Sequence, residues 1–236
     1  MHIIAHRGFN GRYPEMSSQA YEKALELPIH GVECDIRLSR DGVVVCTHDR
    51  TMARVAGVDV AVSAADVGKL KECNIGEEDN PQQLLTLDEL LDMVFATDKH
   101  IYIEPKHPVR QGVMLEEQLV MRLRYRGLQA SDRIHVISFS HASMRRMKRL
   151  APKLETFYLR REWEQHVNPK DVFLSRPSGA GMSIERAKKD PWLINRRGMP
   201  TYLFTVNEAE DMRFARDHGV QVMATDFPDL ALEVLR

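Results

Sequence analysis

The sequence predicts an α/β fold of the TIM (β/α)8 barrel type, on three observations. Short β-rich segments alternate with helical patterns along most of the 236 residues, as in a parallel sheet with crossover helices. Eight such strand segments fit a length typical of one barrel domain, roughly 200 to 250 residues. No linker rich in Pro, Gly or Ser divides the chain. A single domain over residues 1–236 is therefore expected, and a doubly wound open sheet is the main alternative.

The eight expected strands are short apolar or alternating runs. In chain order they are residues 2–6, 31–36, 100–106, 133–139, 154–159, 179–185, 200–206 and 221–226. Helical patterns, in which apolar residues recur every three or four positions, fall between them. They are residues 17–27, 85–96, 112–127, 141–151, a weak one at 162–167, 184–198 and 208–219. Three helices end at a glycine, namely Gly127, Gly198 and Gly219, where a left-handed residue is expected to close the helix.

One segment departs from this alternation. Residues 43–49, VVVCTHD, follow the second strand with only the turn SRDG between them. That connection is too short for a parallel crossover, so a β-hairpin is expected above the barrel rim. The hairpin would bring His48 back toward Glu33 and Asp35. The polar region 49–98 is the least regular part, and we expect a small irregular insertion there, either a cap over the rim or a plain surface excursion.

Composition argues against several classes of protein. Lys and Arg number 33 and Asp and Glu 34, for a net charge of -1, so no global field recruits nucleic acid or an anionic membrane. The sequence has no run of about eighteen apolar residues and no signal-peptide pattern, so no stable membrane insertion is expected. Cys34, Cys46 and Cys73 are an odd number without metal-type pairing. They are expected to be small buried residues in a reducing, cytoplasmic setting. The sequence does not indicate the oligomeric state.

Charged residues gather at the ends of the early strands. Glu33 and Asp35 lie two residues apart on one strand, and Glu104 and Lys106 lie two apart on the next. Since residues i and i+2 of a strand share a face, each pair is expected to point inward. Chemistry in such barrels takes place at the carboxyl ends of the strands.

The three carboxylates are expected to need a partner. Crowded carboxylates repel one another unless they are protonated or bind a cation. A divalent metal is the economical explanation, and ligation by oxygen alone favours Mg2+ or Ca2+ over zinc. The alternative is a set of ion pairs with Arg7, Arg37 and Lys106.

Two histidines, His6 and His48, accompany the carboxylates. With an unperturbed pKa of about 6.5, one histidine can accept a proton while the other donates one at neutral pH. Arg7 offers a planar fork to an anionic oxygen, and Lys106 offers a point charge. A metal, two bases and two cations together suit attack at phosphorus.

Five segments resemble, in order and spacing, the motifs of glycerophosphodiester phosphodiesterases. They are HRGFNGRYPEMSSQAYEKAL, ECDIRLSRDGVVVCTHD, IYIEPKHP, VISFS and YLFTVNEAEDMRFARDHGVQVMATDFPDL. The resemblance runs from about His2 to Asp229, and the first two motifs combined are quite specific. It implies a TIM barrel that uses a divalent cation to hydrolyse glycerophosphodiesters, small-molecule substrates, to glycerol 3-phosphate and an alcohol.

The resemblance also implies roles for individual residues. The implied metal ligands are Glu33, Asp35 and Glu104. The implied acid and base are His6 and His48. The implied substrate-binding residues are Arg7 and Lys106, for the phosphate, and Phe204, as an aromatic wall for glycerol.

Three positions depart from the family pattern, and one of them is Pro105, which stands where an aliphatic residue is usual. Met16 stands where the first motif usually has an asparagine that helps the metal or phosphate shell, and Phe204 stands where a tryptophan is usual. Glu15 is retained, as a helix cap or as an acid behind the metal ligands. Core packing is the alternative role for Phe204.

Several functional alternatives stay open at this point. The nucleophile is water or the substrate's own 2-hydroxyl, which would give a cyclic phosphate, and neither histidine is assigned as acid or base. A phospholipase D-like enzyme acting on lysophospholipids or sphingolipids would need an apolar lip beside the pocket. A noncatalytic binding protein on the same barrel is a third reading, against which stands the retention of both histidines.

Overall fold

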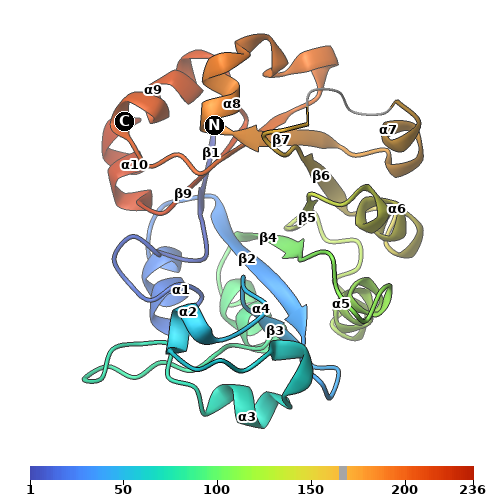
Figure 1. Ribbon diagram of the computed structural model, residues 1–236. Coiled ribbons are helices and arrows are strands. Elements are labelled where there is room, and N and C mark those ends of the chain that lie inside the picture. Colours follow the sequence, from blue (N-terminus) through green and yellow to red (C-terminus); the bar gives the residue numbers. More distant parts are fainter. Residues whose placement is uncertain (165–168) are drawn as a thin grey trace.

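The computed structural model describes residues 1–164 and 169–236. Its parallel strands are β1 (His2–Ala5), β2 (Gly31–Leu38), β4 (His100–Pro105), β5 (Ile134–Ser138), β6 (Glu155–Leu159), β7 (Gly179–Ser183), β8 (Thr201–Phe204) and β9 (Val222–Thr225). They pair in the order β1-β9-β8-β7-β6-β5-β4-β2, and β1 also pairs with β2, which closes the sheet (Figure 1). The barrel prediction is confirmed, and the open-sheet alternative is wrong.

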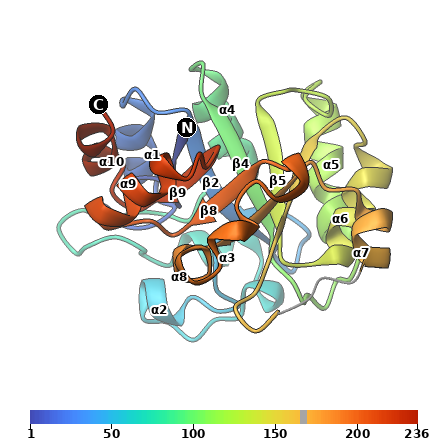
Figure 2. The same ribbon diagram turned by 90° about the horizontal axis from the view of Figure 1, so that it is seen from above.

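Helices surround the strands (Figures 1 and 2). They are α1 (Ser18–Leu25), α4 (Leu87–Phe95), α5 (Met114–Tyr125), α6 (His141–Leu150), α7 (Pro169–Ser175), α8 (Ile184–Lys189), α9 (Ala209–Asp217) and α10 (Pro228–Val234). Helices α7 and α10 were not predicted. The weak pattern at 162–167 lies partly outside the described residues, and residues 162–163 form a turn.

The helix predicted over residues 184–198 is shorter than expected. It ends at Lys189, and two 3-10 turns follow, Pro191–Leu193 and Arg196–Gly198. Pro191 explains the break, because proline lacks an N–H and disfavours the helical conformation in the residue before it. The predicted left-handed glycines are confirmed, with φ of 71° at Gly127, 73° at Gly198 and 69° at Gly219.

The predicted hairpin is confirmed. Strand β3 (Val44–Cys46) pairs antiparallel with the end of β2, with Ile36 opposite Cys46. The insertion after it contains α2 (Ala53–Ala56), a 3-10 turn (Val62–Ala64) and α3 (Val67–Lys71), drawn in cyan and teal in Figure 1. These elements and β3 pack around a small apolar core of their own, made of Val45, Met52, Val62, Ala65, Leu70, Cys73, Ile75 and Leu84.

Aromatic side chains fill the interior of the barrel. The Tyr202 ring lies 5.5 Å from that of Tyr102 and 6.0 Å from that of Phe157, within a buried cluster that also includes Ile4, Ile137 and Leu159. This packed layer separates the carboxyl ends of the strands from their amino ends, as is usual in such barrels.

Composition also led to expectations about the three cysteines and about membrane-spanning helices. Cys34, Cys46 and Cys73 are buried and free, as expected. Among the helices of the described ranges, none combines the length and the apolar character needed to cross a bilayer.

Candidate active site

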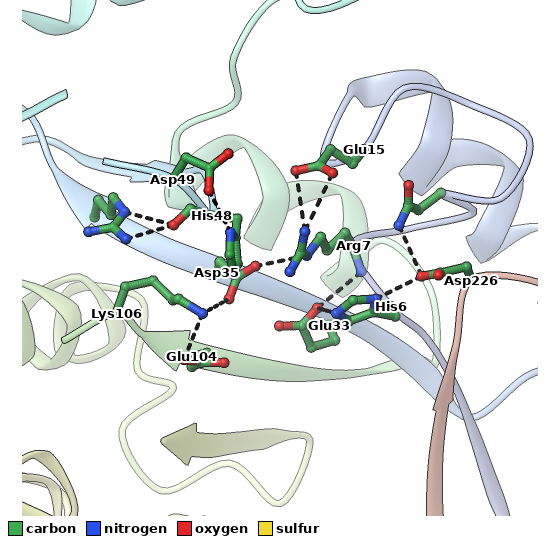
Figure 3. Close-up of polar contacts among 12 residues, drawn as sticks. His6, Arg7, Glu15, Glu33, Asp35, His48, Asp49, Glu104, Lys106 and Asp226 are labelled. Carbon is green, nitrogen blue, oxygen red and sulfur yellow. Dashed lines mark hydrogen bonds and ion pairs between the residues drawn. The ribbon is translucent and has the colours of Figure 1, made fainter. Parts of the chain in front are cut away.

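Three buried carboxylates meet at the carboxyl ends of β2 and β4 (Figure 3). Glu33 and Asp35 lie two residues apart on β2, so their side chains point to the same face. Asp35 is paired with Glu104 in the parallel register of β2 and β4. One oxygen from each of the three side chains lies within 4.8 Å of the others. The inward orientation follows from the i, i+2 spacing on each strand.

Two cations contact these carboxylates. Lys106 Nζ lies 3.1 Å from Asp35 Oδ1 and 2.9 Å from Glu104 Oε1. Arg7 Nε lies 3.0 Å from Asp35 Oδ2, and the Arg7 backbone N–H donates to Glu33 Oε2 at 3.0 Å. Arg37, the third cation considered from the sequence, instead donates from Nε and Nη2 to the His48 carbonyl, at 2.9 and 2.7 Å. The ion-pair alternative is therefore only partly realised.

The pKa values of the three carboxyl groups show that their negative charge is not shared equally. Burial, followed by repulsion from Asp35, raises the pKa of Glu33 well above its usual value and raises the pKa of Glu104 to about 7. Burial would also raise the pKa of Asp35, but Lys106 and Arg7 together hold it below its usual value. The two glutamates thus lack the positive charge that would keep both of them ionised.

A hard divalent cation fits this donor set. Asp35 Oδ2 is buried and accepts no hydrogen bond, although Arg7 Nε is close to it. Carboxylate oxygens are the ligands that Mg2+ and Ca2+ prefer. Added positive charge among Glu33, Asp35 and Glu104 would offset both their repulsion and their burial.

Each of the two histidines is held by a carboxylate at Nδ1. His6 Nδ1 lies 2.7 Å from Asp226 Oδ1, and His48 Nδ1 lies 2.9 Å from Asp49 Oδ1. When each Nδ1 donates its proton to the carboxylate, each neutral ring has Nε2 available to accept one. Burial lowers the pKa of His48, although attraction to Asp35 opposes the shift. His48 is therefore neutral near pH 7 and able to act as a base.

Asp226 closes the last strand, and its contact with His6 was not predicted from the sequence. Besides His6, its side chain accepts hydrogen bonds from Asn10 Nδ2 at 2.9 Å and from Asn207 Nδ2 at 2.7 Å. Three donors on one carboxylate fix its orientation and, through it, that of the His6 ring. The available signal was positional, since Asp226 directly follows β9, the barrel neighbour of β1.

The insertion supplies a second support that the sequence did not reveal. Arg54 in α2 lies 2.6 Å from Glu15 Oε1 through Nη2, and 2.5 Å from Asp49 Oδ2 through Nε. Glu15 in turn pairs with Arg7 Nη1 at 3.4 Å. The Arg54 guanidinium thus binds both Glu15, the partner of Arg7, and Asp49, the partner of His48. Glu15 is not the helix cap, since Ser17 caps α1.

Met16 and Phe204 pack against apolar residues. Met16 is buried in the apolar core, with a left-handed φ of 54°, a conformation that asparagine adopts more readily than methionine. Phe204 ends β8, and its ring packs edge-on against Phe139 at 5.5 Å. A contact between Phe204 and substrate stays a prediction.

A cavity of about 150 Å3 adjoins the carboxylates. Its lining residues are Glu104, Lys106, His107, Ser138, Phe139, Ser140 and Arg161. The cavity begins at a carboxylate and a lysine of the site, so a group bound at the carboxylates can extend into it.

Comparisons with known proteins give one consistent result. The model of the Glycerophosphoryl diester phosphodiesterase family matches residues 6–230. A protein of Mycobacterium tuberculosis named "Probable glycerophosphodiester phosphodiesterase 1" is 34% identical, over 96% of this chain and 89% of its own length. The "Glycerophosphodiester phosphodiesterase" of Caldanaerobacter subterraneus is 26% identical, over 99% of this chain and 97% of its own length.

Solved structures give the same fold. The glycerophosphodiester phosphodiesterase of Thermotoga maritima superposes with a TM-score of 0.78 at 26% identity, covering 99% of this chain and 97% of its own. A phosphodiesterase of Oleispira antarctica, solved in complex with the product sn-glycerol-3-phosphate, superposes with a TM-score of 0.88 at 20% identity, covering 100% of this chain and 96% of its own.

Proposed function

Since the chain belongs to the glycerophosphoryl diester phosphodiesterase family, we propose that it hydrolyses glycerophosphodiesters to glycerol 3-phosphate and an alcohol, using a divalent cation and two histidines. The observation that carries this proposal is the arrangement around the carboxylates. His6 and His48, each held at Nδ1 by a carboxylate, accompany three buried acids and two cations. Such a set provides proton transfer and charge stabilisation at one phosphorus.

Glu33, Asp35 and Glu104 would hold the cation, Mg2+ or Ca2+. When bound, such an ion supplies Lewis-acid polarisation of a phosphoryl oxygen. Arg7 and Lys106 lie against Asp35 on either side, so their charges can be shared with a phosphate bound above the carboxylates. These two side chains orient the phosphate and stabilise the charge that develops on its oxygens.

The histidines move the protons. One Nε2 takes the proton of the attacking hydroxyl, and the other gives a proton to the departing alcohol. Both water and the 2-hydroxyl of the glycerol moiety satisfy this scheme as nucleophiles. Rapid quenching distinguishes them, because attack by the 2-hydroxyl gives a cyclic phosphate before glycerol 3-phosphate, whereas attack by water gives none.

We also propose a setting for this activity. Residues 1–236 act as one domain, in which the insertion within 49–98 supports the site through Arg54. The buried free thiols support a cytoplasmic location. The cavity beside Glu104 suits a small-molecule substrate. This cavity takes the leaving alcohol.

The direct test is release of glycerol 3-phosphate from glycerophosphocholine and glycerophosphoethanolamine, with Mg2+, Ca2+, Mn2+ or EDTA. We expect release with at least one metal and none with EDTA. Lysophosphatidylcholine is assayed in parallel, because Trp163, 74% exposed in the turn after β6, is an apolar group that a lipid would contact. Activity on the acylated substrate alone would indicate the phospholipase D-like reaction. Substrate binding without turnover under all conditions would indicate a binding protein.

An Asp226→Asn variant tests how His6 is positioned. Its kcat is expected to fall about 10-fold or more, because His6 loses the carboxylate that orients its ring. Asp211→Asn, which removes a surface partner of Lys188, is the matched control. An unchanged kcat in Asp226→Asn would contradict the positioning role.

A further inference from the structure

Four histidines gather at the amino ends of the strands, the end of the barrel opposite the candidate active site. His2 and His100 are the first residues of β1 and β4, His30 directly precedes β2, and His135 is the second residue of β5. His100, Tyr102 and Glu104 lie at every second position of β4. The same inward face therefore carries an imidazole at one end, an aromatic ring in the middle and a carboxylate at the other end.

Three of these histidines have the spacing of metal ligands. One ring nitrogen from each of His30, His100 and His135 lies within 4.8 Å of the others. His100 Nδ1 and His135 Nε2 are 2.9 Å apart. His2 stacks on His30, with ring centroids 3.8 Å apart, and forms one wall of the group. His30 directly precedes β2, and His100 and His135 lie on β4 and β5, the next two strands in the barrel.

A carboxylate orients the most buried of the three. Glu155, the first residue of β6, lies 2.9 Å from His135 Nδ1 through Oε2. With that nitrogen donating to the carboxylate, the lone pair of His135 Nε2 points toward His100. Metal-binding histidines commonly donate their other ring nitrogen to a carboxylate in this way, which fixes the tautomer and strengthens the ligand. Tyr102, stacked on the His135 ring at 4.2 Å, holds the ring from one face.

The surrounding charges leave the group accessible to a cation. Arg133 is close, but its Nη2 donates to the carbonyls of Val94, Thr97 and Lys99 at 2.6 to 3.0 Å. Lys99 Nζ pairs with Asp98 at 3.3 Å. Arg133 is thus engaged by carbonyl oxygens and Lys99 by a carboxylate, and the terminal amine, a third positive group, acts on His2 rather than on a candidate ligand. Glu155 adds a negative charge on the histidine side.

We propose that His30, His100 and His135 form a second metal site, separate from the carboxylates, for a borderline transition ion such as Zn2+. Imidazole nitrogen suits Zn2+, Co2+ and Ni2+, whereas the all-oxygen cluster suits Mg2+ or Ca2+. An ion there ties together the starts of β2, β4 and β5. The site stands on its own geometry and does not depend on the proposed phosphodiester hydrolysis.

The test is titration of the metal-stripped full chain with Co2+, followed by visible absorption. Cobalt bound by nitrogen in a four-coordinate site absorbs strongly, whereas six-coordinate cobalt among oxygens absorbs weakly. We expect strong bands in the wild type and in Glu104→Gln, which alters only the carboxylate cluster. The bands should disappear in His100→Gln and on addition of Zn2+. Glu155→Gln should weaken Co2+ binding by roughly 10- to 100-fold, since it removes the partner of a ligand.

Two controls separate metal binding from folding. His218→Gln changes a histidine near the end of α9, outside the group, and should keep the bands. Circular dichroism and urea unfolding should show that His100→Gln remains folded. Absence of strong bands in the wild type, bands that persist in folded His100→Gln, or bands lost in Glu104→Gln would each overturn the proposal.

Discussion

A His48→Ala variant is expected to hydrolyse glycerophosphocholine about 10²- to 10⁴-fold more slowly than the wild type, the range that general acid or base catalysis supplies. The reason is geometric. Asp49 holds His48 at Nδ1, so Nε2 can exchange protons with the substrate. His6, held by Asp226 in the same manner, should give a comparable loss when it is changed to alanine. The measurement is kcat for release of glycerol 3-phosphate under saturating metal.

The two histidine variants can be assigned to acid and base by changing the leaving group. A glycerophosphodiester of p-nitrophenol expels an anion that is stable at neutral pH and needs no proton. The variant that lacks the general acid should therefore recover much of its rate on this substrate, whereas the variant that lacks the base should not. His218→Ala, outside the site, should match the wild type on both substrates. Near-wild-type rates for both site variants on glycerophosphocholine would contradict two-histidine catalysis.

The fold was largely predictable because its signals are local. Apolar runs separated by helical patterns predicted all eight parallel strands, and the short SRDG turn predicted the hairpin. The failures also have local causes. The helical pattern over residues 184–198 continued through Pro191, but a proline at this position interrupts an α-helix. Helix α10 was missed because it begins at Pro228, a residue that breaks the interior of a helix but is tolerated at its first position.

The site was predictable only as far as strand geometry reaches. The i, i+2 rule predicted that Glu33 with Asp35, and Glu104 with Lys106, face inward. The register of β2 with β4, which puts Asp35 opposite Glu104, came only from the structure. The supports of the site depend on contacts between distant segments. Arg54 reaches Glu15 from 39 residues away, and no spacing in the sequence signals that contact. The histidines at the opposite end are likewise separated along the chain, and only the closed barrel brings them together.

A Glu104→Gln variant is expected to lose about 10³-fold in kcat, because the proposed cation would supply several kcal/mol of charge stabilisation and would need its full set of ligands. The substitution keeps the size of the side chain and an oxygen that can accept a hydrogen bond from Lys106. Lys106 also keeps its ion pair with Asp35 at 3.1 Å. The loss therefore reports on the missing charge, and excess Mg2+ should restore part of the rate.

The same variant should change how the stability of the metal-free protein depends on pH. Burial and Asp35 raise the pKa of Glu104 from 4.5 to about 7. The folded chain therefore keeps a proton that the unfolded chain has released, and stability falls as the pH rises through this window. Glutamine has no proton to lose, so the fall should be smaller in Glu104→Gln, and the variant should be more stable than the wild type at pH 8. Urea unfolding in EDTA at pH 5 and pH 8 measures the difference.

Glu116→Gln is a matched control with the opposite sign. Burial would raise the pKa of Glu116, but its contacts, foremost that with His107 at 2.7 Å, together lower it below its usual value. Its ionised form stabilises the fold above the usual pKa of a glutamate, and that contribution is lost only as the pH falls through its lowered value. Glu116→Gln should therefore destabilise the protein at pH 8. If Glu104→Gln, like Glu116→Gln, destabilises the protein at pH 8, the carboxylate cluster is not strained by unbalanced charge, and its fit to a divalent cation loses its physical basis.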